Sequence, residues 1–307
     1  DAGNQTTIAL HANVSEQMPG DVIAWGANWE GQTDVPTDLT DVIAIDSGLY
    51  HSLALRSDGM VVVWGGGPSA GIPGGLSDVV AISSGFFNSL ALKADGTVVA
   101  WGDSSSGQID VPADLINPVA IAGGIFTGFA LRSNGTVVAW GDSGHSALNV
   151  PVNLTDVIAI SSFYRHILAL KVDGTVVAWG ENNEGQTDIP PGLIDVTAIF
   201  AGYEHSLALK SDGTVVAWGN NSDGQTNVPG GLTDIIALGG GANYSLALKS
   251  DSTVVAWGNN GSGQTDVPAN LNHVSAISAG YLHNLALKEP SPAIATSSLL
   301  TFGDVPL

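Results

Sequence analysis

The sequence predicts an all-β fold, a seven-bladed β-propeller with four-stranded blades. The dipeptide Trp-Gly occurs seven times, at spacings of 39, 37, 39, 39, 39 and 39 residues. A constant period of this size is typical of one supersecondary unit copied around a ring or along a solenoid. The apolar runs are short and rich in β-branched residues, and Asp-Gly, Pro and Gly interrupt them, as expected for short strands joined by tight turns.

Each repeat contains four strand-like segments, and this number favours a propeller blade. The third segment is apolar almost throughout, as expected for a blade that packs on neighbours at both faces. Its Trp and the preceding Ala should point to opposite faces, so we expect the Trp of one blade to pack on small residues of the next. In the repeat of residues 195–229 the segments are DVTAIFAG (195–202), HSLALK (205–210), TVVAWG (214–219) and TNVP (226–229).

The turn between the second and third strands carries a hairpin signal. Asp212-Gly213 and its counterparts tolerate the positive φ angles that a tight β-hairpin requires. Asp251-Ser252 departs from this pattern, so we expect that turn to be strained or of another type.

The repeat frame is offset, because a third-strand copy precedes the first complete repeat. We expect DVIAWG (21–26) to pair beside HNLALK (283–288) and close the ring, which protects the edge strands of an open array. The alternative closing segment is SSLLTFGDVP (297–306), which resembles degraded third and fourth strands. The expected organisation is an N-terminal extension (1–20), the propeller (21–288) and a C-terminal linker and extension (289–307).

Composition excludes several classes of function. Eight basic residues against 29 acidic ones give a net charge of −21, and such a surface repels the phosphate backbones of nucleic acids. Without cysteine the chain has neither disulfides nor thiolate metal sites. It has no signal-like segment and no run of about 18 apolar residues, so we expect no membrane insertion. We expect a mature bacterial protein that is secreted or at the cell surface, and a monomer.

The segment AGYEHSLALKSDGTVVAWGNNSDGQ (201–225) resembles the repeat of the regulator of chromosome condensation family, and the resemblance covers residues 21–288. The short period is most similar to that of bacterial members, which include secreted propeller-type inhibitors of β-lactamase. The resemblance implies a propeller that binds a protein through loop aromatics and acids. Eukaryotic members that exchange nucleotide on Ran usually have longer repeats, and this sequence lacks their inserted wedge.

Strand alternation places the loops on two faces. We define the top face by the loops between first and second strands and those after Trp-Gly, and the bottom face by the Asp-Gly turns. Large aromatics surrounded by acids are typical of protein-recognition surfaces; alternatively, each aromatic caps its own blade. The partner-binding candidates are Trp29, Tyr50, Phe86, Phe87, Phe126, Tyr164, Arg165, Glu184, Tyr203, Glu204, Asp223, Asn243 and Tyr281.

Two sets of polar residues recur in phase with the repeat and are interpreted as framework. His51, His166, His205 and His283 share one position, which raises a metal hypothesis, but adjacent blades would hold them too far apart to share an ion. The basic residues that end the second strands should cover apolar surface with their stems while their charges meet a nearby Asp. These are Arg56, Lys93, Arg132, Lys171, Lys210, Lys249 and Lys288.

The sequence indicates a binding module. It contains no G-x-S-x-G elbow, no phosphate loop and no unique Ser, His and Asp set, so we expect no catalytic residue, cofactor or metal. The predicted function is non-catalytic binding of a protein partner at the top face, in its narrower form the inhibition of an enzyme. The alternatives are a secreted carbohydrate-binding lectin, because loops with aromatics and Asn or Asp also suit sugars, and a cell-surface or matrix structural protein. An enzyme ranks third.

Overall fold

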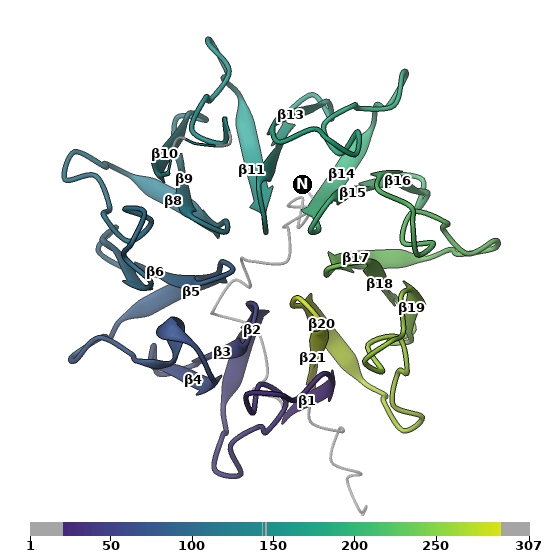
Figure 1. Ribbon diagram of the computed structural model, residues 1–307, viewed down its shortest axis with the longest axis horizontal. Helices are drawn as coiled ribbons and strands as arrows, with labels where there is room; N and C mark the ends of the chain where they lie inside the picture. The colour runs from purple at the N-terminus through teal and green to yellow at the C-terminus, as the bar shows by residue number, and fades with distance from the viewer. Residues whose placement is uncertain (1–20, 143, 145, 290–307) are drawn as a thin grey trace, which may run out of the picture.

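A computed structural model of the protein describes residues 21–142, 144 and 146–289, and it contains seven three-stranded antiparallel sheets around a central axis (Figure 1). This confirms the seven-bladed β-propeller. The predicted N-terminal extension (1–20) and nearly all of the C-terminal one (290–307) lie outside the described residues, as does the alternative closing segment 297–306. Within the described residues no helix is long and apolar enough to cross a bilayer.

Each blade has an inner, a middle and an outer strand, and the inner strands lie nearest the axis (Figure 1). The inner strands are β2 (Val42–Ser47), β5 (Val79–Ser84), β8 (Pro118–Gly123), β11 (Val157–Ser162), β14 (Val196–Ala201), β17 (Ile235–Gly240) and β20 (Val274–Ala279). The middle strands are β3 (His51–Arg56), β6 (Asn88–Lys93), β9 (Thr127–Arg132), β12 (His166–Lys171), β15 (His205–Lys210), β18 (Tyr244–Lys249) and β21 (His283–Lys288). The outer strands are β4 (Val61–Gly65), β7 (Val98–Gly102), β10 (Val137–Gly141), β13 (Val176–Gly180), β16 (Val215–Gly219), β19 (Val254–Gly258) and β1 (Asp21–Gly26).

We number the blades from the N-terminus, so that blade 1 holds β2, β3 and β4, and blade 6 holds β17, β18 and β19. Blade 7 is composite and holds β20, β21 and β1. The remaining element is a 3-10 turn, η1 (Pro68–Ala70), in the loop that follows blade 1.

The middle strand is the most buried part of every blade. All of its residues except the last are buried in each of the seven copies. Packing on both faces leaves no solvent-facing side, which explains why the sequence HSLALK does not alternate between apolar and polar residues. The core therefore consists of layers between neighbouring blades.

The repeated Trp side chains fill these layers, although not as the sequence suggested. Trp140 of blade 3 lies in one cluster with Leu90 and Leu92 of blade 2 and with Ala130 of its own blade. Each Trp thus shares a cluster with large apolar residues of the preceding blade, two leucines in six cases and Phe129 with Leu131 for Trp179, rather than with small residues of the next blade. The leucines supply the larger apolar area, which makes this the more favourable contact.

The predicted fourth strand is not part of any sheet of described residues, so this part of the prediction is wrong. In the fourth segment of blade 5, the amide of Asn227 donates to the carbonyl of Gly224 at 3.0 Å, and the amide of Val228 donates to the carbonyl of Thr226 at 3.0 Å. The amide of Thr226 donates to Oδ1 of Asn221 at 3.1 Å. Local turns occupy the amides that a fourth ladder strand would need.

The N-terminal strand closes the ring, as predicted. Strand β1 pairs antiparallel with β21, from Asp21 opposite Lys288 to Gly26 opposite His283. Trp25 then joins a core cluster with residues of blade 6, such as Leu246 and Leu248. The first described strand therefore completes the last blade and leaves none of the seven sheets with fewer than three strands.

Candidate protein-binding face

The loops between inner and middle strands converge on the axis at the top face. There Leu49, Phe86, Ile125, Phe163 and Tyr164 form one buried cluster, although they come from four different blades. Five half-buried aromatic residues pack against this cluster. We call the whole group the aromatic cap; its half-buried members are Tyr50, Phe87, Phe126, Tyr203 and Tyr281.

Contacts between blades hold the cap together. The rings of Tyr164 and Tyr203 stack with centroids 3.8 Å apart, and Phe86 meets Tyr281 edge to face at 5.2 Å. Backbone hydrogen bonds also cross the blade boundaries, for example from the amide of Ile125 to the carbonyl of Tyr164 at 2.9 Å. The aromatics therefore do not cap their own blades singly; they seal the centre of the ring together.

Burial divides the candidate residues into two groups. Phe86 and Tyr164 are only 7% and 8% exposed, so they shape the cap and offer little area to a partner. Trp29 is 62% exposed and lies in the loop after β1. That loop is joined to the cap region, because the amide of Ala27 donates to the carbonyl of Leu282 at 2.8 Å.

The second residue of each cap loop makes the top face asymmetric. In blade 7 and blades 1 to 3 it is apolar or aromatic, and in blades 4 to 6 it is polar or charged. Together with Trp29, the first group forms an apolar half of the face, and the second forms a polar half. The apolar residues are Leu282, Tyr50, Phe87 and Phe126, and the polar ones are Arg165, Glu204 and Asn243.

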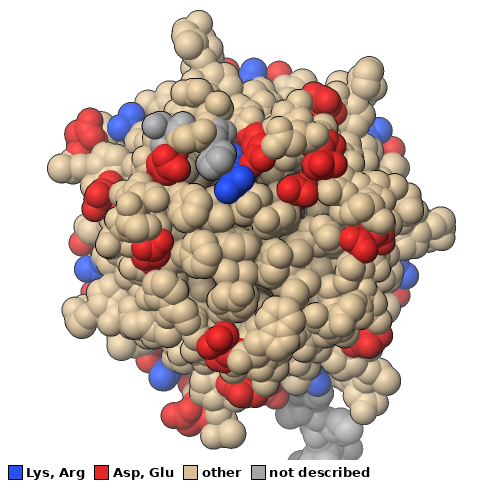
Figure 2. All heavy atoms as spheres, in the orientation of Figure 1, with Lys and Arg blue, Asp and Glu red and all other residues tan. Residues whose placement is uncertain are grey.

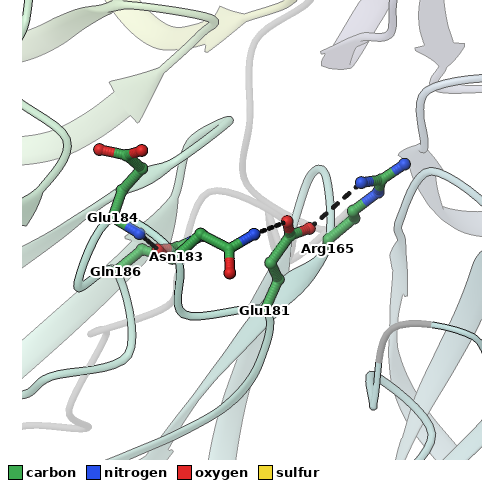
Figure 3. A network of polar contacts seen from close by, with 5 residues as sticks. All are labelled: Arg165, Glu181, Asn183, Glu184 and Gln186. Atoms are coloured by element: carbon green, nitrogen blue, oxygen red, sulfur yellow. Dashed lines mark hydrogen bonds and ion pairs between the residues drawn. The ribbon is translucent and has the colours of Figure 1, made fainter.

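In the polar half, Arg165 contacts an acidic side chain and an aromatic ring. Its Nη1 lies 3.4 Å from Oε2 of Glu181, and its guanidinium lies 4.7 Å from the ring centroid of Tyr164. Asn183 donates to the same Glu181 carboxylate from the other side (Figure 3). Glu184 is exposed, and its amide donates to Oε1 of the buried Gln186 at 2.9 Å (Figure 3).

The other polar candidates are also held in place by the loops that follow Trp-Gly. Glu204 accepts a hydrogen bond from Nδ2 of Asn220 at 3.1 Å. Asp223 accepts from Nδ2 of Asn243 at 2.9 Å and from Nδ2 of Asn259 at 2.8 Å, which links the loop after blade 5 to two segments of blade 6. These carboxylates are therefore ordered before any partner binds.

Charge is distributed unevenly over this face. Figure 2 shows an uncharged centre with acidic residues around it, while most basic residues lie at the outer rim. The basic residues that end the middle strands pair locally as predicted: five of them meet the Asp two positions later in the hairpin turn, with N–O distances from 3.0 to 3.9 Å. Among the described residues, Arg165 is the one Lys or Arg that does not end a middle strand.

The recurrent histidines are framework, as predicted. Nε2 of His166 lies 2.9 Å from Oγ of Ser206 in the next blade, and that hydroxyl donates to the carbonyl of Gln186 at 2.8 Å. Since Ser206 uses its only proton on Gln186, His166 must donate from Nε2 and cannot act as a base toward the serine. Burial, the largest cause, lowers the pKa of His166 to about 3 and that of His51 to about 4.

Among the residues that the structure describes, no group of three His, Cys, Asp or Glu side chains is placed to hold an ion.

The sequence interpretation missed one ionisable residue, Asp46, near the end of β2. Its counterparts in the other inner strands are uncharged, which is the signal that could have revealed it. They are Ser83, Ala122, Ser161, Phe200, Gly239 and Ser278.

Comparison with known proteins supports the repeat assignment. The regulator of chromosome condensation (RCC1) repeat matches residues 42–69, 79–108, 157–186, 196–225 and 235–264. Five of the seven blades therefore carry an RCC1-type repeat. No curated protein matches the sequence significantly.

Solved structures share this propeller fold at low sequence identity. Prp20p from Saccharomyces cerevisiae is 18% identical with a TM-score of 0.78, covering 93% of this chain and 97% of that one. Human WBSCR16 is 15% identical with a TM-score of 0.70, covering 88% and 99%. The ectodomain of the Physcomitrella patens receptor kinase CR4 is 22% identical with a TM-score of 0.67, covering 78% and 68%. At these identities the likeness shows the fold alone.

Proposed function

We propose that this RCC1-type propeller is a non-catalytic module that binds a protein partner through its top face. The observation that carries the proposal is the aromatic cap, whose face has an apolar half and a polar half held by hydrogen bonds and an ion pair. A large exposed aromatic beside a preformed apolar surface is typical of a binding hot spot, because it adds contact area at a small cost in side-chain entropy. Trp29 has this position.

The charges indicate the chemistry of the partner. Glu204 and Asp223 are fixed by neighbouring amides, and the chain carries a net charge of −21. Such a face attracts a partner with basic side chains and repels acidic ones. We infer that the partner places an apolar group against Trp29 and Phe87 and basic groups over the polar half.

Proteins of the same fold support a binding role. The structure of Prp20p was reported together with its binding to Gsp1p and histones, and yeast RCC1 (Prp20) was crystallised bound to Kap60. Those partners belong to those proteins, but they illustrate that propellers of this kind serve protein recognition. In its narrower form, our proposal is that this chain is a secreted or cell-surface bacterial protein that blocks an enzyme.

The test compares wild type with Trp29→Ala and with Ile194→Ser. Ile194 is 53% exposed and precedes β14 at the end opposite the cap, so its variant is a matched control for the loss of an exposed apolar group. The probes are a purified class A β-lactamase, partners captured from the native source and a glycan array. We expect a protein ligand whose Kd rises at least about tenfold for Trp29→Ala and less than about twofold for Ile194→Ser.

Other outcomes would contradict the proposal. A protein ligand that tolerates Trp29→Ala but is lost with Ile194→Ser places recognition on the opposite side of the ring. Binding to glycans alone would favour the lectin alternative.

A further inference from the structure

The inner strands line a small cavity on the axis, directly under the aromatic cap. Phe163 belongs to both, since it lines the cavity and packs in the cap. The cavity volume is about 40 Å³. A single water needs roughly 10–15 Å³ measured in this way, so the space suits a very small occupant.

The cavity wall is polar on one side, and Asp46 dominates its charge. The Asp46 carboxylate accepts hydrogen bonds from the amides of Ser84 at 2.6 Å and Ser47 at 3.0 Å, and from Oγ of Ser278 at 3.0 Å. None of the described residues that line the cavity carries a positive charge. The carboxylate is therefore hydrogen-bonded but has no counter-ion from the described protein.

Unpaired hydroxyls beside Asp46 are the second observation. Ser47 and Ser84 line the cavity and are 1% and 3% exposed, yet neither Oγ has a hydrogen-bond partner. Oγ of Ser162, also in the lining, has none either. By contrast, Oγ of Ser161 accepts from the amide of Ala201 at 3.0 Å. Buried hydroxyls normally have partners, so the unpaired ones mark a place where something else supplies the contact.

We propose that this cavity binds a small monovalent cation, an alkali-metal ion or ammonium, through the Asp46 carboxylate and the serine hydroxyls. Carboxylate and hydroxyl oxygens are hard donors that suit such ions. One carboxylate balances a single positive charge, whereas divalent sites usually contain more acidic ligands. The strong negative charge of the whole chain also favours a cation over an anion.

The experiment measures the thermal midpoint of the full chain at constant ionic strength. Tetramethylammonium chloride, whose methyl groups keep its charge away from oxygen ligands, is replaced stepwise by NaCl, KCl or NH4Cl, and the three salts distinguish the alkali-metal ions from ammonium. The variants are Asp46→Asn, Ser84→Ala and the surface control Asp38→Asn. A ligand at about 100 times its Kd should raise Tm by several degrees.

We expect this rise for wild type and Asp38→Asn, a weaker response for Ser84→Ala and none for Asp46→Asn. Because Asp46→Asn could fail to fold, Rb⁺ is also soaked into crystals of the wild type, where an anomalous peak beside Asp46 is expected. The proposal is overturned if all variants respond alike, if no salt differs from tetramethylammonium, or if the Rb⁺ peak lies elsewhere. The result is independent of the partner at the top face.

Discussion

Ser252 has a φ of 67°, at the turn position where five other blades have glycines with φ between 76° and 83°. A residue with a Cβ is disfavoured in this left-handed region by about 1–2 kcal/mol. The sequence predicted strain here from the replacement of Gly in the Asp-Gly pattern, and the structure confirms that the turn keeps its shape and strains the serine instead.

We therefore expect Ser252→Gly to stabilise the protein. The relieved backbone strain exceeds the extra entropy that glycine adds to the unfolded chain, which leaves a net gain of about 0.5–1 kcal/mol. The urea midpoint of unfolding measures this gain. Gly213→Ser in blade 5 is the reciprocal control and should destabilise by a similar amount; equal midpoints for all three proteins would contradict the argument.

Residue function was less predictable than residue conformation. The sequence located the aromatic loops, but it did not show that Phe86 and Tyr164 are buried while Trp29 is exposed. Exposure here depends on how loops from different blades meet at the axis, and this is a property of the closed ring. Asp46 was missed for a related reason, since the side chains of one repeat do not show which neighbours they face across a channel.

At the scale of elements, the interface between blades depends on a backbone carbonyl. In all seven blades the Trp Nε1 donates to a backbone carbonyl at 2.9 to 3.1 Å. The acceptor lies 32 positions earlier in the sequence, except that Trp25 donates to Gln264 because the ring closes there. That residue is Gln in five cases, but Ser69 and Ala147 serve equally. The irregular units are tolerated because the contact uses main chain rather than the Gln side chain.

The strand pattern was predictable, and the missing fourth strand was not. Short apolar runs between Asp-Gly turns fix the middle and outer strands, because a buried strand needs apolar residues and a hairpin needs its turn. The TNVP segment has a strand-like composition, but its amides bond within the loop. Composition does not reveal which acceptor an amide will find.

The histidines between blades should make stability depend on pH. His51 is neutral in the folded protein because burial lowers its pKa from 6.5 to about 4. As the pH falls, His51 is protonated in the unfolded chain before it is protonated in the folded protein. The contribution of neutral His51 to the free energy of unfolding is therefore fully present above pH 6.5 and is lost as the pH falls toward 4. Asp46, whose pKa is raised to about 6, has the opposite effect between pH 6 and 3.8 and offsets at most one histidine.

We expect the free energy of unfolding to fall steeply below pH 6.5, and His51→Asn to reduce this dependence. Blade 2 has Asn88 at the position that His51 occupies in blade 1, so the substitution fits the fold. The slope should decrease by up to one proton, roughly 1.4 kcal/mol per pH unit between pH 6 and 5. Urea unfolding at pH 8, 7, 6 and 5 measures it, and parallel curves for both proteins would show that His51 is not the group that titrates.

At the scale of the whole molecule, a single strand closes the ring. The sequence predicted this closure because the repeat frame is offset, and the pairing of β1 with β21 confirms it. The two strands come from opposite ends of the described chain, so no hairpin turn joins them. Strand β2 of blade 1 also contacts β20 and β21 of blade 7, and β1 adds the outer strand that completes this last blade. The stability of the ring is thus shared between its two ends.

A circular permutant tests this view of closure. In blade 5, three residues, Ser211, Asp212 and Gly213, join the paired residues Lys210 and Thr214. The corresponding pair in blade 7 is Lys288 and Asp21, which lie opposite each other without a connecting turn. A chain of residues 27–288 followed by Ser-Asp-Gly and residues 21–26 should therefore rebuild blade 7 with an ordinary hairpin. We expect it to unfold cooperatively with a free energy within about 1–2 kcal/mol of the parent, because every contact of β1 is retained.

The chain of residues 27–288 alone should lose the burial of Trp25 and leave β21 as an unpaired edge. Losing a buried Trp costs about 3–5 kcal/mol, which is comparable with the whole stability of many domains. We expect a much lower midpoint in thermal unfolding, followed by circular dichroism, and self-association on size exclusion through the open edge. If this truncated chain melts at the same temperature as the permutant, β1 contributes nothing to the ring, and blade 7 is stable with two strands.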